Sequence, residues 1–278
     1  MAGDLATLMT WSYGLCATAY ALLAIFLLSQ IRGGRAAAPN SAMLAAVVFT
    51  LCWSLLSLGA AETDSSSLYA IAMEADILRY GAWFVFILQL LRPSADMGPQ
   101  SLRSHRAVAL AIGLAVVVGL VAQALVASGV MLPIPPKWLV FHPLLLAVIG
   151  LFLLEQLLRN VATDSRWNVK PLCLGLAGAF IFDLYVYSDA MLFGKLDADA
   201  VSIRGLVHAL VMPLVWLCVA RNRDWARRVR LSRKMVMHTT GLLAVGFYLL
   251  FMAAVGYYVR FFGGDWGRAS ELKYGVVP

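Results

Sequence analysis

The segment "MEADILRYGAWF", residues 73–84, places three charged side chains at the start of an otherwise apolar run that continues as "WFVFILQLL". A helix that crosses the hydrocarbon of a membrane needs about 20 predominantly apolar residues, and residues 68–91 are long enough. If this helix spans a membrane, Glu74, Asp76 and Arg79 lie in or near hydrocarbon. A lone charge there costs at least about 2.5 kcal/mol, so each of them needs a partner.

The composition of the whole chain supports the membrane interpretation. Hydrophobic residues make up 62% of the 278 residues and charged residues 13%, and the mean hydropathy is +0.80. Soluble domains carry about 25% charged residues, so the chain is predicted to be an integral membrane protein. We assign the net charge of +7 to loops beside the lipid bilayer and expect no nucleic-acid partner. The N-terminus lacks the basic region of a signal peptide, so the first apolar run is expected to remain as a span.

Eight apolar runs are long enough to cross a bilayer, and the breaks between them carry the Gly, Pro and charged residues of loops. The predicted fold class is therefore all-α, a polytopic integral membrane helical bundle with no soluble domain. We expect the spans near residues 9–31, 43–61, 68–91, 107–127, 138–158, 170–193, 202–220 and 236–259.

The basic residues predict the orientation of these spans. Fifteen Lys and Arg residues follow the odd-numbered spans, six lie on the opposite side, and Arg79 lies within the third span. Cytoplasmic loops carry the excess of Lys and Arg. Both termini are therefore expected outside the cytoplasm.

The charges of the third span have candidate partners in the sixth. Asp76 precedes Arg79 by three positions and shares its helix face, and a rise of about 1.5 Å per residue places Arg79 near the bilayer midplane. By the same rise Asp183 lies in the outer half of its span, with Tyr187 one turn further out and Asp189 near the outer surface. We hypothesise a polar cluster of Asp76, Arg79, Asp183 and Tyr187, and include Asp189 as a candidate sensing residue.

Two interpretations of this cluster stay open, and they can share the same residues. The charges can tie helices together, or they can form a pocket that senses a ligand or a proton; a transport path is a third. His142 and His208 are expected to be helix-packing histidines. The cysteines have no metal-ligand spacing and are expected to be small buried hydrophobes, so no metal site and no catalytic residue is predicted.

The most basic stretch is "RNRDWARRVRLSRK", residues 221–234. It suits a short helix on anionic lipid head groups, where each basic residue contributes about 1 kcal/mol. Enforcement of the topology alone is an equal alternative. Its basic residues are Arg221, Arg223, Arg227, Arg228, Arg230, Arg233 and Lys234.

Several motifs carry a resemblance to a known family. In order they are "EQLLRN", "RWNVKPLCLGLAGAFIFDLYVYSDAMLF", "ARNRDW", "SRKMVMHTTGLL" and "GYYVRFFGGDWG", preceded by the weaker match "LRYGAWFVFILQLLRP". Together they resemble the N-terminal membrane region of the PrsK family of sensor histidine kinases, which is associated with exosortase and PEP-CTERM sorting in Gram-negative bacteria. The resemblance covers residues from about 10 to 268.

This resemblance implies a multi-pass protein of the bacterial inner membrane. In the family a further span, a GAF-type domain and a kinase core follow, and the dimeric kinase uses ATP and Mg to pass a phosphoryl group to a response regulator. None of the four histidines here has the acidic neighbour of a phosphoacceptor box. We therefore expect residues 1–268 to be the sensor region, 269–278 to be a divergent or truncated tail, and this chain to hold no cofactor itself.

The predicted function is to relay an envelope or membrane cue to such a kinase, in the regulation of exopolysaccharide and exosortase-linked genes. The alternatives are a small-molecule transporter and a membrane scaffold protein. The sequence has neither internal repeats nor matching broken spans, which counts against the transporter.

Overall fold

A computed structural model describes residues 2–32, 38–63, 65–92, 99–129, 136–161 and 163–221. All of them belong to one structural unit, Met1–Ser232. Three of the features expected from the sequence lie outside the described residues: the eighth span at 236–259, the basic segment beyond Arg221 and the tail at 269–278.

The described part of the chain is all-helical, as predicted. It contains α1 (Ala2–Gln30), α2 (Ala38–Thr63), α3 (Ser66–Leu90), α4 (Pro99–Ala127), α5 (Pro136–Asn160), α6 (Thr163–Phe193) and α7 (Ala198–Arg221).

Six of these seven helices are long and apolar enough to cross a membrane, which indicates a membrane protein. The exception is α3, because Glu74, Asp76 and Arg79 fall within every stretch of it that has the length of a span. The third predicted span, near 68–91, is therefore present as a helix, but its three charges distinguish it from the other six helices.

All seven described helices begin before the expected spans, and the difference is largest for α1, α4 and α6. α1 starts at Ala2 and not near residue 9. α4 starts at Pro99 and not near residue 107, and α6 starts at Thr163 and not near residue 170. Proline suits the first turn of a helix, since the backbone N–H it lacks would have no helical partner there. Polar residues expected in loops thus form extra helical turns.

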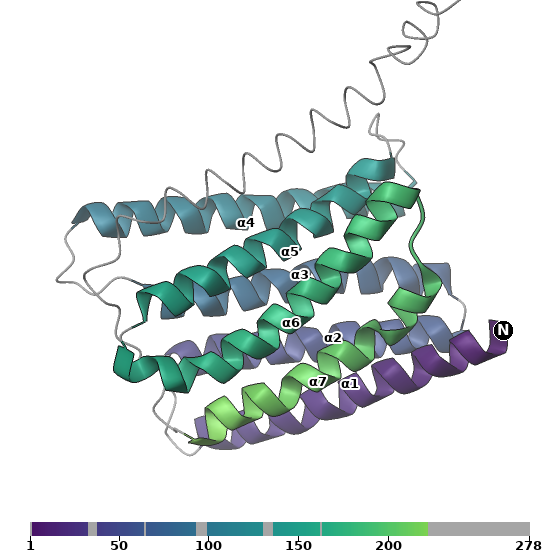
Figure 1. The fold of residues 1–278 in the computed structure, drawn as a ribbon. Helices are drawn as coiled ribbons and strands as arrows, with labels where there is room; N and C mark the ends of the chain where they lie inside the picture. The colour runs from purple at the N-terminus through teal and green to yellow at the C-terminus, as the bar shows by residue number, and fades with distance from the viewer. Residues whose placement is uncertain are drawn as a thin grey trace, which may run out of the picture. The chain divides into compact units, whose positions relative to one another are not determined.

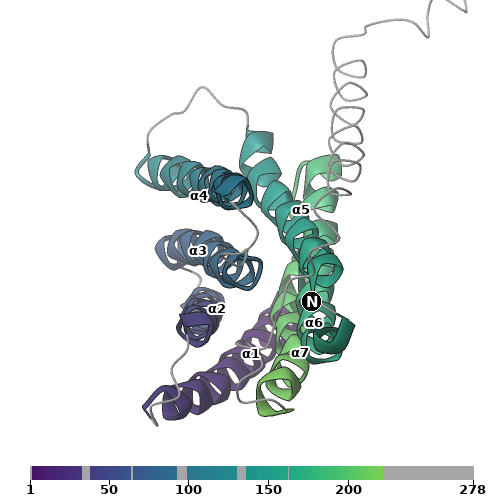
Figure 2. The ribbon, with the colours of Figure 1, turned by 90° about the vertical axis from the view of Figure 1, so that its left-hand side faces the viewer.

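The helices pack in the order of the sequence and close into a ring. Figure 1 shows them lying side by side, and Figure 2, which looks nearly along their axes, shows α1 to α4 in one row facing α5, α6 and α7. Each helix contacts the next, α7 contacts α1, and α3 also contacts α5. This arrangement brings one side of α3 towards α6 and α7.

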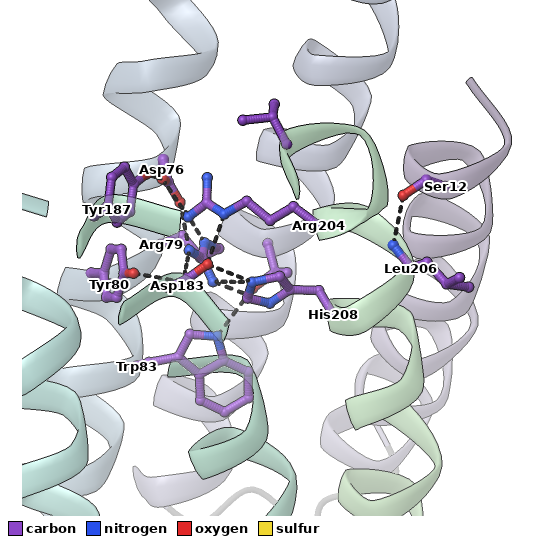
Figure 3. Close-up of polar contacts among 12 residues, drawn as sticks. Ser12, Asp76, Arg79, Tyr80, Trp83, Asp183, Tyr187, Arg204, Leu206 and His208 are labelled. Atoms are coloured by element: carbon purple, nitrogen blue, oxygen red, sulfur yellow. Dashed lines mark hydrogen bonds and ion pairs between the residues drawn. The ribbon is translucent and has the colours of Figure 1, made fainter. Parts of the chain in front are cut away.

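α1 and α7 approach each other closely at Gly205. Among the described glycines, Gly205 lies closest to the backbone of another helix. A Cβ atom added to Gly205 would lie 2.8 Å from the carbonyl carbon of Ser12 and from the nitrogen of Tyr13. One residue further, the backbone N–H of Leu206 donates to Ser12 Oγ at 2.7 Å (Figure 3). Small residues allow such close approach of helices.

The α4–α5 contact is made by a histidine against a glycine. The imidazole of His142 occupies the space that a Cβ on Gly119 would need, and its Nε2 lies 3.0 Å from the carbonyl oxygen of Ala115. This is the packing role that the sequence predicts for His142.

Three prolines lie inside helices: Pro143 in α5, Pro171 in α6 and Pro213 in α7. Each has no N–H to donate to the carbonyl four residues earlier, so each helix is interrupted at one hydrogen bond.

Candidate functional site

Two carboxylates and two guanidinium groups meet between three helices of the bundle. Asp76 and Arg79 come from α3, Asp183 from α6 and Arg204 from α7 (Figure 3). Their side chains are between 0% and 7% exposed. We call these four residues the charge network.

Each guanidinium of the charge network bridges both carboxylates. Arg79 donates from Nε to Asp76 Oδ1 at 2.8 Å and from Nη2 to Asp183 Oδ2 at 3.0 Å. Arg204 donates from Nε to Asp183 Oδ1 at 2.7 Å and from Nη2 to Asp76 Oδ2 at 2.8 Å. The formal charges balance, two positive against two negative. Charge-assisted bonds of this kind are stronger than neutral ones.

Three neutral groups complete the hydrogen bonding of the carboxylates. Tyr80 donates to Asp183 Oδ2 at 2.5 Å, and Tyr187 donates to Asp76 Oδ2 at 2.9 Å. His208 Nε2 lies 3.3 Å from Asp183 Oδ1, and its Nδ1 lies 3.3 Å from Nη1 of Arg79. The tautomer with its proton on Nε2 satisfies both contacts of His208. Arg79 also donates from Nη2 to Asp76 Oδ1 at 2.5 Å, so every carboxylate oxygen accepts two hydrogen bonds.

An indole ring covers the two guanidinium groups. The centroid of the Trp53 ring lies 4.6 Å from Cζ of Arg79 and 4.9 Å from Cζ of Arg204. Trp53 is itself 2% exposed. A cation held against an aromatic face is attracted by the negative face of the ring, and more so where water is excluded.

Helical spacing explains how three separate segments supply these groups. Residues three, four and seven apart lie on one face of a helix. The pairs Asp183 and Tyr187, and Arg204 and His208, are each four residues apart. In α3 the series is Asp76, Arg79, Tyr80 and Trp83, whose indole N–H donates to Thr50 Oγ1 of α2 at 3.1 Å.

The structure brings together four of the five residues proposed from the sequence as a sensing cluster: Asp76, Arg79, Asp183 and Tyr187. It leaves out Asp189, whose carboxylate makes no hydrogen bond or ion pair with any residue of the described ranges. Glu74 also stands apart from the charge network, because two positions along a helix place it on a different face from Asp76. Its Oε1 is buried and has no hydrogen-bond partner in the described part of the chain.

Sequence reasoning missed Tyr80, Arg204 and His208. Arg204 was counted among the basic residues outside the membrane, because it is the third residue of the expected span 202–220. His208 was expected to be a packing histidine and instead contacts two charged partners. The available signal was the spacing of Arg204 and His208, two ionisable residues four positions apart at the start of an apolar run.

A cavity of about 570 Å³ adjoins the charge network. It lies between the first turns of α1, α3 and α7 and the last turns of α2 and α6. Its lining includes Trp53, Tyr187 and Arg204, which are also parts of or neighbours to the network. Among the residues whose side chains the structure describes, Arg204 is the only charged one in that lining.

Metal coordination has no candidate within the described ranges, where no three His, Cys, Asp or Glu side chains come together in a suitable way. The four cysteines are unpaired; Cys16, Cys173 and Cys218 are buried, and Cys52 is exposed.

Comparisons with known proteins give no family for the chain. No protein-family model matches it, and neither a curated protein nor a solved structure matches. The charge network and the cavity beside it are therefore the features from which a function can be inferred.

Proposed function

We propose that this chain is the membrane-embedded sensory region of a PrsK-like sensor histidine kinase in the bacterial inner membrane. The family motifs in the second half of the sequence support the kinase assignment. The observation that supports sensing is the charge network, which ties α3, α6 and α7 together beside a cavity. Ionisable residues inside a membrane mark functional sites by default.

The charge network suits the transmission of a displacement. Arg204 of α7 bonds to Asp183 of α6 and to Asp76 of α3, and Arg79 of α3 bonds to Asp183, so a shift of α7 against α6 must break or exchange charged bonds. Such bonds in a low-dielectric interior are costly to leave unmade. A network of this kind favours a few discrete arrangements over a continuous range, and a cue that prefers one of them shifts the balance.

The proposal includes eight spans with both termini outside the cytoplasm. Arg204 is one of the six basic residues that the sequence places on the outer side, yet its guanidinium is buried in the bundle. Without it, five basic residues remain on that side against fifteen on the other. The larger imbalance supports the proposed orientation.

The test is a signalling assay in a full-length PrsK-like kinase that carries this sensory region. Output is read from a promoter under the control of the response regulator, and protein level from an immunoblot of membranes. We expect Asp183→Asn to change output by at least about fivefold, a coupling free energy of about 1 kcal/mol. Asp189→Asn is the matched control, with the same chemistry on the same helix and no described partner, and output should stay within twofold.

Tyr187→Phe is the second variant if Asp183→Asn fails to accumulate, because it removes a single hydroxyl from Asp76 and no charge. Wild-type output from stably expressed Asp183→Asn and Tyr187→Phe proteins would leave the network a purely structural role. Saturable uptake of a solute by proteoliposomes containing the chain would favour the transporter.

A further inference from the structure

The cavity beside the charge network has the dimensions of a small-molecule site. Its volume of about 570 Å³ falls within the range of about 300–1,000 Å³ found for ligand pockets. Ser66 and Tyr69 are exposed members of its lining, and Tyr187 and Arg204 are buried ones. The cavity therefore leads from the surface of the bundle to the charge network.

One polar group at the buried end has unused hydrogen-bonding capacity. Arg204 donates from Nε to Asp183 and from Nη2 to Asp76, and its Nη1 makes no hydrogen bond to any described residue. In Figure 3 this nitrogen points away from the two aspartates. Arg204 is 5% exposed and lines the cavity. Its two Nη1 hydrogens are thus donors available to a molecule in the cavity.

The charge balance of the network determines which ligand these donors suit. Asp76 and Asp183 already neutralise Arg79 and Arg204, and among the described lining residues there is no further cation to compensate an acid. An anion would add an uncompensated charge in a low-dielectric site, which is costly. A cation would meet Arg204 and no free carboxylate. An uncharged acceptor pays neither cost.

The remaining walls favour an apolar and partly planar molecule. Side chains such as Leu5, Met9, Met73 and Val186 line the cavity together with four aromatic residues, Tyr13, Trp53, Tyr69 and Tyr187. Aliphatic groups bury well against the former, and flat rings pack well against the latter.

We propose, as an extension of the sensory function above, that this cavity binds an uncharged, membrane-soluble amphiphile through a carbonyl oxygen that accepts a hydrogen bond from Arg204 Nη1. The carbonyl lies at the buried end of the cavity, and the apolar body lies along α1, α2 and α3. Bound there, the molecule contacts α7 through the same guanidinium that joins α7 to α3 and α6. Two kinds of lipid carry this chemistry, a quinone ring and an acyl ester.

Native mass spectrometry of the purified chain in detergent tests the proposal with four separate probes. Decyl-substituted benzoquinone and glycerol monolaurate are the two neutral carbonyl compounds, and laurate and dodecylamine are the charged comparisons. We expect saturable one-to-one binding of at least one neutral probe, at least tenfold tighter than either charged probe. Whether the quinone or the ester binds identifies the source of the carbonyl. Equal or tighter binding of laurate or dodecylamine would overturn the proposal.

Two substitutions locate the binding site. Ala60→Phe fills the cavity from α2 without touching the charge network, and should weaken binding at least tenfold. Ala111→Phe makes the same change at an exposed position of α4 outside the cavity, and should leave binding within twofold. Ser57→Phe replaces Ala60→Phe if that variant does not fold. Binding that survives a folded cavity-filling variant unchanged, or no saturable binding of any probe, would refute the site.

The outcomes separate this proposal from the sensory function. The binding assay needs no kinase, and the reporter assay with Asp183→Asn needs no ligand. If no probe binds but Asp183→Asn still changes reporter output, the ligand proposal is refuted and the sensory function stands.

Discussion

Arg204 of α7 and Asp183 of α6 face each other across a helix interface, with Nε 2.7 Å from Oδ1 and both side chains buried. Each also bonds to α3, Arg204 through Asp76 and Asp183 through Arg79. Taking a charge out of water costs several kcal/mol, and only complete pairing offsets that cost. The stability of the bundle therefore depends on the balance of the whole network more than on any single pair.

Neutralising one aspartate should destabilise the bundle strongly. Asp183→Asn leaves two guanidinium groups with one carboxylate, and breaking a buried pair in this way costs about 3–5 kcal/mol. SDS titration followed by tryptophan fluorescence measures the free energy of unfolding. Asp189→Asn, which has no described partner, should change it by less than about 0.5 kcal/mol. Equal effects of the two substitutions would show that the network adds nothing to stability.

Removing a matched pair of charges should cost less than the two single changes together. Arg79→Met leaves a net negative charge and Asp76→Asn a net positive one, whereas the double variant is balanced. The expected coupling between the two sites is about 1–3 kcal/mol, measured by a double-mutant cycle with the same SDS titration. Effects that add to within about 0.5 kcal/mol would contradict the picture of a shared charge balance.

The close approach of α1 and α7 should make Gly205 intolerant of a side chain. In Gly205→Ala the new methyl group meets the backbone of Ser12 and Tyr13 at 2.8 Å, and neither can move without shifting α1. Overpacking of this kind costs about 1–3 kcal/mol. Gly178→Ala in α6 is the control, because nothing lies within 4 Å of its new Cβ. Since alanine is the better helix former, the control should gain up to about 1 kcal/mol.

The proposed orientation can be mapped with reporter fusions. Green fluorescent protein joined between α3 and α4 should fluoresce, since that connection is expected in the cytoplasm. Alkaline phosphatase should be inactive there and active when joined between α4 and α5. The reverse pattern at both positions would place the N-terminus in the cytoplasm and overturn the assignment of odd-numbered loops.

The parts of the site that the sequence predicted are those that follow from depth and helix face. Asp76 and Arg79 share a face of α3, Asp183 and Tyr187 share a face of α6, and both pairs lie deep in apolar runs, so their meeting could be expected. The contribution of α7 could not, because spacing within a helix does not say which neighbour that face will meet. Arg204 also lies at the start of its apolar run, where a basic residue is usually interpreted as part of a loop.

Helix lengths were predicted less well for a related reason. The length of an apolar run reflects the thickness of the hydrocarbon that the helix crosses, about 30 Å. It does not indicate where the helix itself begins or ends. Pro99 and Thr163 begin helices in polar sequence, outside the apolar runs, so the runs give no sign of those extra turns.

Pro213 gives α7 a mechanical property that follows from its position. The N-terminal part of the helix, with Arg204, Gly205 and His208, is bonded to and closely packed against its neighbours. Beyond it, Pro213 leaves the carbonyl of Ala209 without its helical donor, and a helix bends most easily at such a point. α7 therefore consists of two helical segments joined by a hinge at Pro213. A displacement of its N-terminal part should therefore tilt the part beyond Pro213 more readily than it shifts that part along the helix axis.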